Sequence, residues 1–147
     1  MSTGGPDAAV VVDGRFELRR QLGEGGQAVV WSVFDRRLNV ERAIKILLPK
    51  LAHSPKLRAR FEDEARAMAV LEHTNVVRVY DVAECNGAAY FVMERVRGGS
   101  LADRVVRSGP LPPRLAVQTA LQICAGAAAA HAVGIVHRDI KPHNVLV

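Results

Sequence analysis

A run of glycines near the N-terminus has a composition and spacing suited to phosphate chemistry. It comprises Gly23-Glu24-Gly25-Gly26-Gln27-Ala28 and lies between two segments rich in apolar residues. Glycine has no Cβ, so the backbone N–H groups of such a run can approach phosphate oxygens closely. Many such runs are simple turns, and a dinucleotide-binding turn needs a helix directly after the glycines. A β-branched segment follows here, so the run predicts a glycine-rich hairpin that covers phosphates.

Two charged side chains stand where the surrounding pattern is apolar. Lys45 lies inside an apolar, strand-like segment downstream of the glycines, and Glu64 falls within the apolar stripe of a predicted helix. An ionised carboxylate that is buried without a partner costs roughly 3–5 kcal/mol. Glu64 therefore either faces a cation or lies at the wet edge of a groove. Lys45 is the obvious partner, because its ammonium group can bridge a carboxylate and a phosphate.

The strongest pattern lies near the end of the chain. It comprises His137-Arg138-Asp139-Ile140-Lys141-Pro142-His143-Asn144, which matches H-R-D-x-x-x-x-N at every fixed position. A chance match at this spacing is improbable. It becomes negligible because the glycine run, Lys45 and Glu64 precede it in the same order as in the proteins that carry this pattern.

Five strands and a helix are predicted to position the upstream residues. Ser54 and Pro55 favour a helix that starts there and extends to about residue 73, because serine caps helices and proline suits the first turn. Its predicted apolar stripe is Leu57, Phe61, Met68 and Leu71. Alternating or β-branched segments predict strands at residues 15–22, 28–34, 40–47, 76–83 and 88–93.

Short turns between these strands predict a mainly antiparallel sheet, and helices follow it. Asn86-Gly87 is a strong hairpin signal between the last two strands. Ser100 and Asp103 form a possible capping box for a short helix. An alanine-rich helix is predicted from about residue 113 to 133, with Gly134 as its stop signal. These elements predict an α+β fold.

With these motifs in order, the chain resembles the N-terminal part of a eukaryotic-type protein kinase domain, of the bacterial serine/threonine kind. The resemblance extends from about Arg15 to Val147. It implies a small lobe, made of a five-stranded antiparallel sheet and one helix, and the start of a helical lobe. The implied boundaries are a flexible tail at 1–11, the small lobe and hinge at 12–96, and the beginning of the helical lobe at 97–147.

The resemblance implies ATP and Mg²⁺ as cofactors and a protein serine or threonine hydroxyl as the phosphate acceptor. Lys45, oriented by Glu64, would hold the α- and β-phosphates. Asp139 would accept the hydroxyl proton, Lys141 would steady the γ-phosphate, and Asn144 would bind Mg²⁺. The nucleotide-binding residues that the resemblance implies are Leu22, Gly23, Glu24, Gly25, Gly26, Gln27, Ala28, Val30, Ala43, Lys45, Met93, Glu94, Val96, Ser100 and Leu146.

The sequence departs from the family pattern at two places. Ala28 stands where the family usually has its third glycine, which restricts the backbone slightly. No D-F-G motif follows Asn144, although its aspartate is the main Mg²⁺ ligand of the family. We therefore expect a kinase domain that is truncated before D-F-G and inactive alone. The alternatives are a nucleotide-binding or regulatory module without phosphate transfer and a basic nucleic-acid-binding protein.

Composition excludes several other classes of protein. The 147 residues are 49% hydrophobic and 24% charged, which excludes a disordered chain. The net charge of +5 is spread along the chain, so a nucleic-acid partner is not expected. No uninterrupted apolar run has the length of a membrane span, so no membrane segment is expected. Two distant cysteines cannot form a disulfide framework, and they favour a cytoplasmic location with reduced thiols.

Overall fold

The computed structural model describes residues 10–147, which form two compact units. The first contains residues up to Arg66 together with Val79–Arg95, and the second contains Ala67–Arg78 together with Val96–Val147. Most of the predicted tail, residues 1–9, lies outside the described residues. Val11, the last residue of the predicted tail, already belongs to a strand.

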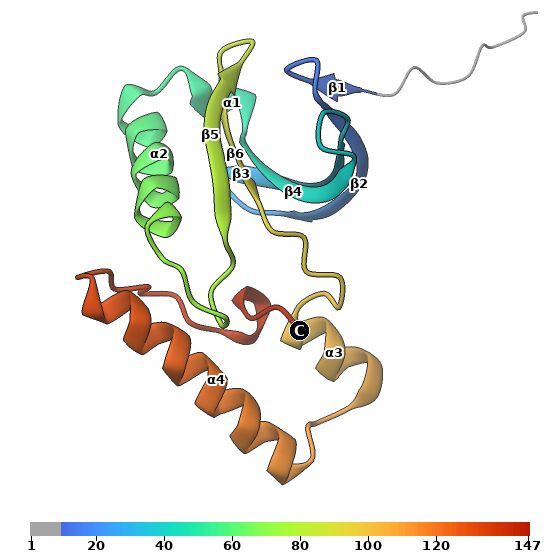
Figure 1. The fold of residues 1–147 in the computed structure, drawn as a ribbon, viewed down its shortest axis with the longest axis vertical. Coiled ribbons are helices and arrows are strands. Elements are labelled where there is room, and N and C mark those ends of the chain that lie inside the picture. Colours follow the sequence, from blue (N-terminus) through green and yellow to red (C-terminus); the bar gives the residue numbers. More distant parts are fainter. Residues whose placement is uncertain (1–9) are drawn as a thin grey trace, which may run out of the picture. The chain divides into compact units, whose positions relative to one another are not determined.

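A six-stranded antiparallel sheet forms the core of the first unit (Figure 1). Its strand order is β1-β2-β3-β4-β6-β5, so the only break in sequence order is the placement of β6 beside β4. The α+β fold is confirmed, but the sheet has six strands rather than five. The sixth is β1, which is too short to show a period in the sequence. The strands are β1 Val11–Val12, β2 Phe16–Glu24, β3 Ala28–Asp35, β4 Val40–Leu47, β5 Val79–Cys85 and β6 Ala88–Met93.

Hairpin turns set the register of the sheet. Asn86 and Gly87 join β5 to β6 with φ angles of 52° and 78°, as a two-residue turn with the favoured twist requires. The predicted hairpin is therefore confirmed. β5 begins at Val79 rather than at residue 76, because the preceding residues form a turn in which the Val76 N–H donates to the His73 carbonyl.

One face of the sheet packs into a hydrophobic core. This core contains Phe16, Val33, Ile44, Tyr90 and Val92, each at most 2% exposed. Cross-strand partners point to the same face of a sheet. The alternate residues of the central strands therefore point to the opposite face, and these include Lys45.

A partly buried ion pair lies where β2 begins and β3 ends. The Arg15 guanidinium donates to both carboxylate oxygens of Asp35, at 3.0 and 2.6 Å, and the Asp35 side chain is 1% exposed. Asp35 also accepts from the backbone N–H groups of Arg37 and Leu38. These hydrogen bonds satisfy the carboxylate, which tolerates burial only when it is paired. Nothing in the sequence pattern predicted this pair.

Two helices belong wholly or mainly to the first unit. The short helix α1, Pro49–Ala52, was not predicted. Helix α2, Pro55–Ala69, begins where predicted, and the Ser54 hydroxyl accepts from the Leu57 N–H at 3.4 Å. It ends at Ala69 rather than near residue 73. Figure 1 shows α2 running alongside β5.

The second unit contains α3, Leu101–Ser108, α4, Pro113–Ala132, and the 3₁₀ turn Pro142–Asn144. The predicted capping box is confirmed, because Ser100 and Asp103 each hydrogen-bond the other's backbone N–H. α4 ends at Ala132, and Gly134 follows in the left-handed region at φ 79°, which supports the predicted stop.

Close backbone contacts hold the second unit together. A Cβ on Gly126 of α4 would lie 2.6 Å from the Asn75 carbonyl oxygen, so the two backbones touch there. The Leu101 N–H donates to the Val145 carbonyl at 2.7 Å, and the Val147 N–H donates to the Gly99 carbonyl at 3.0 Å. These bonds join the segment before α3 to the last residues of the chain.

α4 is also apolar enough to span a membrane by length and composition. It is the only such helix within residues 10–147. Core helices of soluble proteins pass the same test, so one such helix is weak evidence for a span. The expectation that this chain contains no membrane segment stays a prediction.

Candidate active-site residues

The predicted pairing of Lys45 with Glu64 is confirmed. The Lys45 ammonium donates to Glu64 Oε1 at 2.6 Å. Lys45 extends from β4, and Glu64 lies in the third turn of α2. The apolar strand therefore holds the amine in place, and the helix brings the carboxylate to it.

Glu64 is not buried, contrary to the prediction from the helical stripe. Its side chain is 48% exposed, whereas the buried residues of α2 are Phe61 and Ala65. Ala65 was overlooked because its small side chain contributes little to an apolar pattern. The buried face of α2 is thus rotated past Glu64, which lies at its solvent-exposed edge. The wet edge of a groove was the alternative to a position that faces a cation. Both descriptions apply, since Glu64 has a partner and access to water.

Two aromatic rings lie beneath the Lys45 ammonium. Its Nζ is 5.9 Å from the centroid of the Phe61 ring and 5.4 Å from that of Phe91. The rings also contact each other, with centroids 5.1 Å apart. A cation over such faces is attracted by the ring quadrupoles. Sequence reasoning missed Phe91, because only the β4–β6 register places it opposite Lys45.

The strand register places several predicted nucleotide-binding residues on the Lys45 face. Val30 is the cross-strand partner of Lys45 on one side, and Phe91 is its partner on the other. Ala43, two residues from Lys45, pairs with Met93. Partners share a face, and residues two apart on a strand do so too. Val30, Ala43 and Met93 therefore line one apolar surface with Lys45.

The glycine run forms the predicted hairpin between β2 and β3. The Gly25 N–H donates to the Ala28 carbonyl at 2.9 Å and closes the turn. A Cβ on Gly23 or Gly26 would meet nothing within 4 Å, so these residues border open space. Within residues 10–147 we find no hydrogen bond from the Gly26 or Gln27 N–H. Such donors suit an oxyanion.

The second unit holds the H-R-D motif. The Lys141 ammonium lies 2.9 Å from Asp139 Oδ2, and Asn144 Nδ2 donates to the same oxygen at 2.9 Å. The hydrogen bond from Lys141, with that from Asn144, lowers the pKa of the Asp139 carboxyl below its ordinary value. Asp139 is thus a carboxylate at neutral pH. The sequence places all three within one loop, and the structure brings them together.

One residue of this loop has a strained backbone conformation. Arg138 has a φ of 63°, a left-handed conformation that non-glycine residues rarely adopt. The next residue contributes a hydrogen bond from the Asp139 N–H to Nδ1 of His137 at 3.2 Å. Strain of this kind is concentrated at functional sites. Sequence reasoning did not predict this conformation.

The remaining predicted nucleotide-binding residues fall into three places. Leu22 is half-buried in β2, next to the exposed glycines. Glu94 and Val96 follow β6, where the two compact units divide. Ser100 and Leu146 form an isolated antiparallel bridge in the second unit. The Ser100 hydroxyl is engaged in capping α3.

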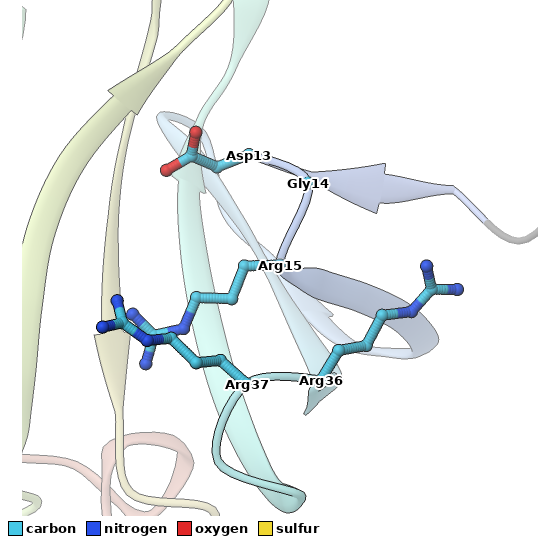
Figure 2. A pocket seen from close by; sticks show the side chains of 5 residues that line it. All are labelled: Asp13, Gly14, Arg15, Arg36 and Arg37. Atoms are coloured by element: carbon cyan, nitrogen blue, oxygen red, sulfur yellow. The ribbon is translucent and has the colours of Figure 1, made fainter.

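A surface pocket of about 480 Å³ lies elsewhere in the first unit, at the turns after β1 and β3 (Figure 2). Figure 2 shows Arg36 pointing away from Arg15 and Arg37. Arg15 is paired with Asp35, and Arg36 donates to a Glu17 oxygen at 3.0 and 2.8 Å. The pocket's carboxylate, Asp13, accepts from the Tyr90 hydroxyl. Most of the charge in this pocket is therefore satisfied within the chain.

Comparison with known proteins gives a consistent result. Residues 16–147 match the family described as "Protein kinase domain". The chain is 41% identical over 136 residues to serine/threonine-protein kinase PrkC of Bacillus subtilis and 42% identical over 142 residues to serine/threonine-protein kinase pkn2 of Myxococcus xanthus. These matches cover 92% and 97% of this chain, but only 21% and 17% of the relatives.

Solved structures show the same likeness. The Mycobacterium tuberculosis PknI kinase domain, in its C20A_R136N double mutant, superposes with a TM-score of 0.81 at 26% identity. The match covers 97% of this chain and 58% of that one. The chain thus spans rather more than half of a solved domain of this kind, and about a fifth of the two curated relatives.

Proposed function

Because the chain belongs to the protein kinase domain family, we propose that it supplies the nucleotide-binding surface and the catalytic loop of a serine/threonine protein kinase. The observation that carries the proposal is the Lys45–Glu64 ion pair on the same sheet face as Val30 and Ala43. An amine held in this way, beside an apolar surface and a glycine hairpin, suits a ligand with a flat ring and phosphates. ATP is such a ligand.

The residues present fit ATP and a divalent cation. The unused N–H groups of Gly26 and Gln27 and the ammonium of Lys45 are donors for phosphate oxygens. With its Nδ2 engaged by Asp139, Asn144 has its side-chain oxygen left for a cation, and oxygen is the ligand that Mg²⁺ prefers. When bound, MgATP supplies the phosphoryl group and neutralises charge that develops during transfer.

The protein residues have separate tasks in the proposed reaction. Lys45 binds phosphate oxygens, and Glu64 orients the amine by accepting its hydrogen bond. Asp139 accepts the proton of the serine or threonine hydroxyl as that oxygen attacks the γ-phosphorus, and ADP leaves. Lys141 holds the transferring phosphate. Only the ionised carboxylate can take the proton, and the hydrogen bonds that lower the pKa of Asp139 keep it ionised.

Nucleotide titration tests the binding half of the proposal. We expect the 147-residue chain to bind ATP, and we expect the Lys45→Met variant to bind it at least tenfold more weakly, since a hydrogen bond to a charged group is worth about 1.5–3 kcal/mol. Lys50→Met is the matched control, because Lys50 is an exposed lysine of α1 outside the proposed site. An unaltered chain that binds no ATP would refute the proposal.

A chimera separates a kinase from a nucleotide-binding module that performs no transfer. Residues 1–147 are joined to the rest of the kinase domain of the Bacillus subtilis relative, which is 41% identical over the matched region. We expect the chimera to phosphorylate a protein on serine or threonine and to lose this activity with Asp139→Asn. ATP binding without transfer would instead favour the regulatory module. Nucleic-acid binding that persists in Lys45→Met and falls steeply with salt would favour the basic-protein alternative.

A further inference from the structure

We propose that Arg58 is a positioning residue for the Lys45–Glu64 pair, which it serves by tying the start of α2 to β5 through Glu84. This inference rests on the proposed function, since it concerns how the same site is held in its working geometry. Arg58 contacts neither Lys45 nor Glu64 in the structure. Its effect on nucleotide binding would be transmitted through the helix.

The geometry of α2 gives Arg58 this role. Residues at three-residue intervals along the helix contact three neighbouring strands in turn. Arg58 pairs with Glu84 of β5, Phe61 packs on Phe91 of β6, and Glu64 pairs with Lys45 of β4. These strands are adjacent in the order β4-β6-β5. The helix is thus attached at both ends of this stretch and at its middle.

The attachment at Arg58 matters because each of the two ion pairs is partly exposed and weak by itself: the side chains are 26% and 48% exposed in Lys45–Glu64, and 35% and 42% exposed in Arg58–Glu84. Ion pairs at such exposure contribute little to stability, because water competes for both charges. Such a pair cannot by itself fix the orientation of a helix. A rigid helix held only at Phe61 could pivot there, and the pivot would carry Glu64 away from Lys45. The Arg58–Glu84 contact opposes this movement from the other end.

Arg58 is itself held in place for this contact. Its Nε donates to Glu62 Oε1, one turn further along α2, at 3.0 Å. Its other guanidinium branch is then directed to Glu84. The two carboxylates raise the pKa of Arg58, with the hydrogen bond to Glu84 as the largest cause. The Arg58–Glu84 pair therefore links two elements, whereas the pairs of Arg66 with Glu62 and Asp63 lie within the helix.

Arg66 provides a matched control on the same helix. It donates to Glu62 at 3.0 Å and to Asp63 at 2.9 Å, and both partners belong to α2. Arg66 is also nearer to Glu64 along the chain than Arg58, which lies about 9 Å away along the helix axis. Arg66→Met therefore removes a positive charge from the same helix without breaking a contact between α2 and the sheet.

The experiment is a double-mutant cycle on the whole 147-residue chain. ATP affinity is measured for the unaltered chain, Arg58→Met, Glu64→Gln and the double variant, with Arg66→Met alongside. We expect Arg58→Met to weaken ATP binding about two- to fivefold, the range that exposed ion pairs allow. We expect Glu64→Gln to have a smaller effect once Arg58 is absent, because its alignment is then already lost. Arg66→Met should leave the affinity unchanged.

A charge exchange separates positioning from a general loss of stability. Arg58→Glu combined with Glu84→Arg restores an ion pair between α2 and β5, so it should recover affinity that Arg58→Glu alone loses. Equal losses for Arg58→Met and Arg66→Met, additive effects of Arg58 and Glu64, or no recovery in the exchanged pair would each overturn the inference.

The same four chains are also unfolded thermally without nucleotide. This measurement tells a failure of the inference apart from a failure of the proposed function. If the unaltered chain binds no ATP, the proposed function fails. The positioning role of Arg58 is then decided by whether Arg58→Met and Glu64→Gln are coupled in the free energy of unfolding. Coupling supports the role, and additivity refutes it.

Discussion

The Lys45→Met substitution should separate nucleotide binding from stability. It removes the ammonium that pairs with Glu64 Oε1 at 2.6 Å and lies over the Phe61 and Phe91 rings. Methionine keeps an unbranched side chain that packs well on aromatic rings. The apolar contacts therefore largely remain, and the substitution mainly removes charge.

The exposure of the pair sets the size of the stability change. The side chains of Lys45 and Glu64 are 26% and 48% exposed, so water can solvate Glu64 after its partner is lost. An exposed pair of this kind contributes about 0.2–1 kcal/mol, whereas a carboxylate left unpaired in the interior would cost roughly 3–5 kcal/mol. For a chain of this length the smaller range corresponds to a fall in Tm of at most about 4 °C.

The two readouts should therefore move by different amounts. Without ligand, the Tm of Lys45→Met should lie within about 4 °C of the Tm of the unaltered chain. Its ATP affinity should fall at least tenfold, and the rise in Tm that ATP produces should shrink accordingly. Lys50→Met should alter neither quantity. A fall of more than about 10 °C would show that Glu64 behaves as a buried charge, and an unchanged ATP affinity would refute the phosphate-binding role of Lys45.

Three further predictions concern other parts of the chain. Arg15→Met should lower the free energy of unfolding, measured in urea, by about 3 kcal/mol because it leaves the buried Asp35 without its cation. The hydrogen bond from Arg15 lowers the pKa of Asp35 in the folded chain. The stabilisation should therefore be present above the ordinary carboxyl pKa and lost as the pH falls through the pKa of the folded chain. An acid titration of the free energy of unfolding that shows no such loss would contradict the pairing. Gly126→Ala should destabilise the chain by about 1–3 kcal/mol, although alanine normally favours a helix, because its Cβ would lie 2.6 Å from the Asn75 carbonyl oxygen; a raised Tm would show that this contact can relax. Residues 1–147 alone should transfer no γ-phosphate to protein, because no D-F-G motif occurs among them, and transfer that Asp139→Asn abolishes would refute this.

The site could be predicted where local pattern and chemistry agree. Lys45 and Glu64 each interrupt an apolar pattern. An amine and a carboxylate in such positions are expected to pair, because each supplies the opposite charge that the other lacks. The H-R-D motif places its carboxylate, amine and amide within one loop, so its internal contacts follow from the sequence alone. The Asn86-Gly87 hairpin and the Ser100 cap were predictable for the same reason, since both are set by neighbouring residues.

The contacts that escaped prediction depend on strand register or on distant partners. Phe91 meets Lys45 only because β6 pairs with β4 in one register. Arg15 and Asp35 lie at the ends of two paired strands, where each is an ordinary charged residue in the sequence. The burial of Ala65 rather than Glu64 depends on how α2 is rotated against the sheet, and a few small residues leave that rotation open.

The exposure of Glu64 changes what its ion pair does for the protein. A buried Lys45–Glu64 pair would have been part of the core, and losing it would unfold the chain. As an exposed pair it contributes little to folding, so its value lies in orienting the amine. Ligand binding and helix placement are then linked, since a phosphate that binds Lys45 more tightly with Glu64 in contact must favour that placement of α2 by the same factor. The inferred tie from Arg58 to Glu84 would act on this equilibrium, because it favours the same placement before any ligand binds.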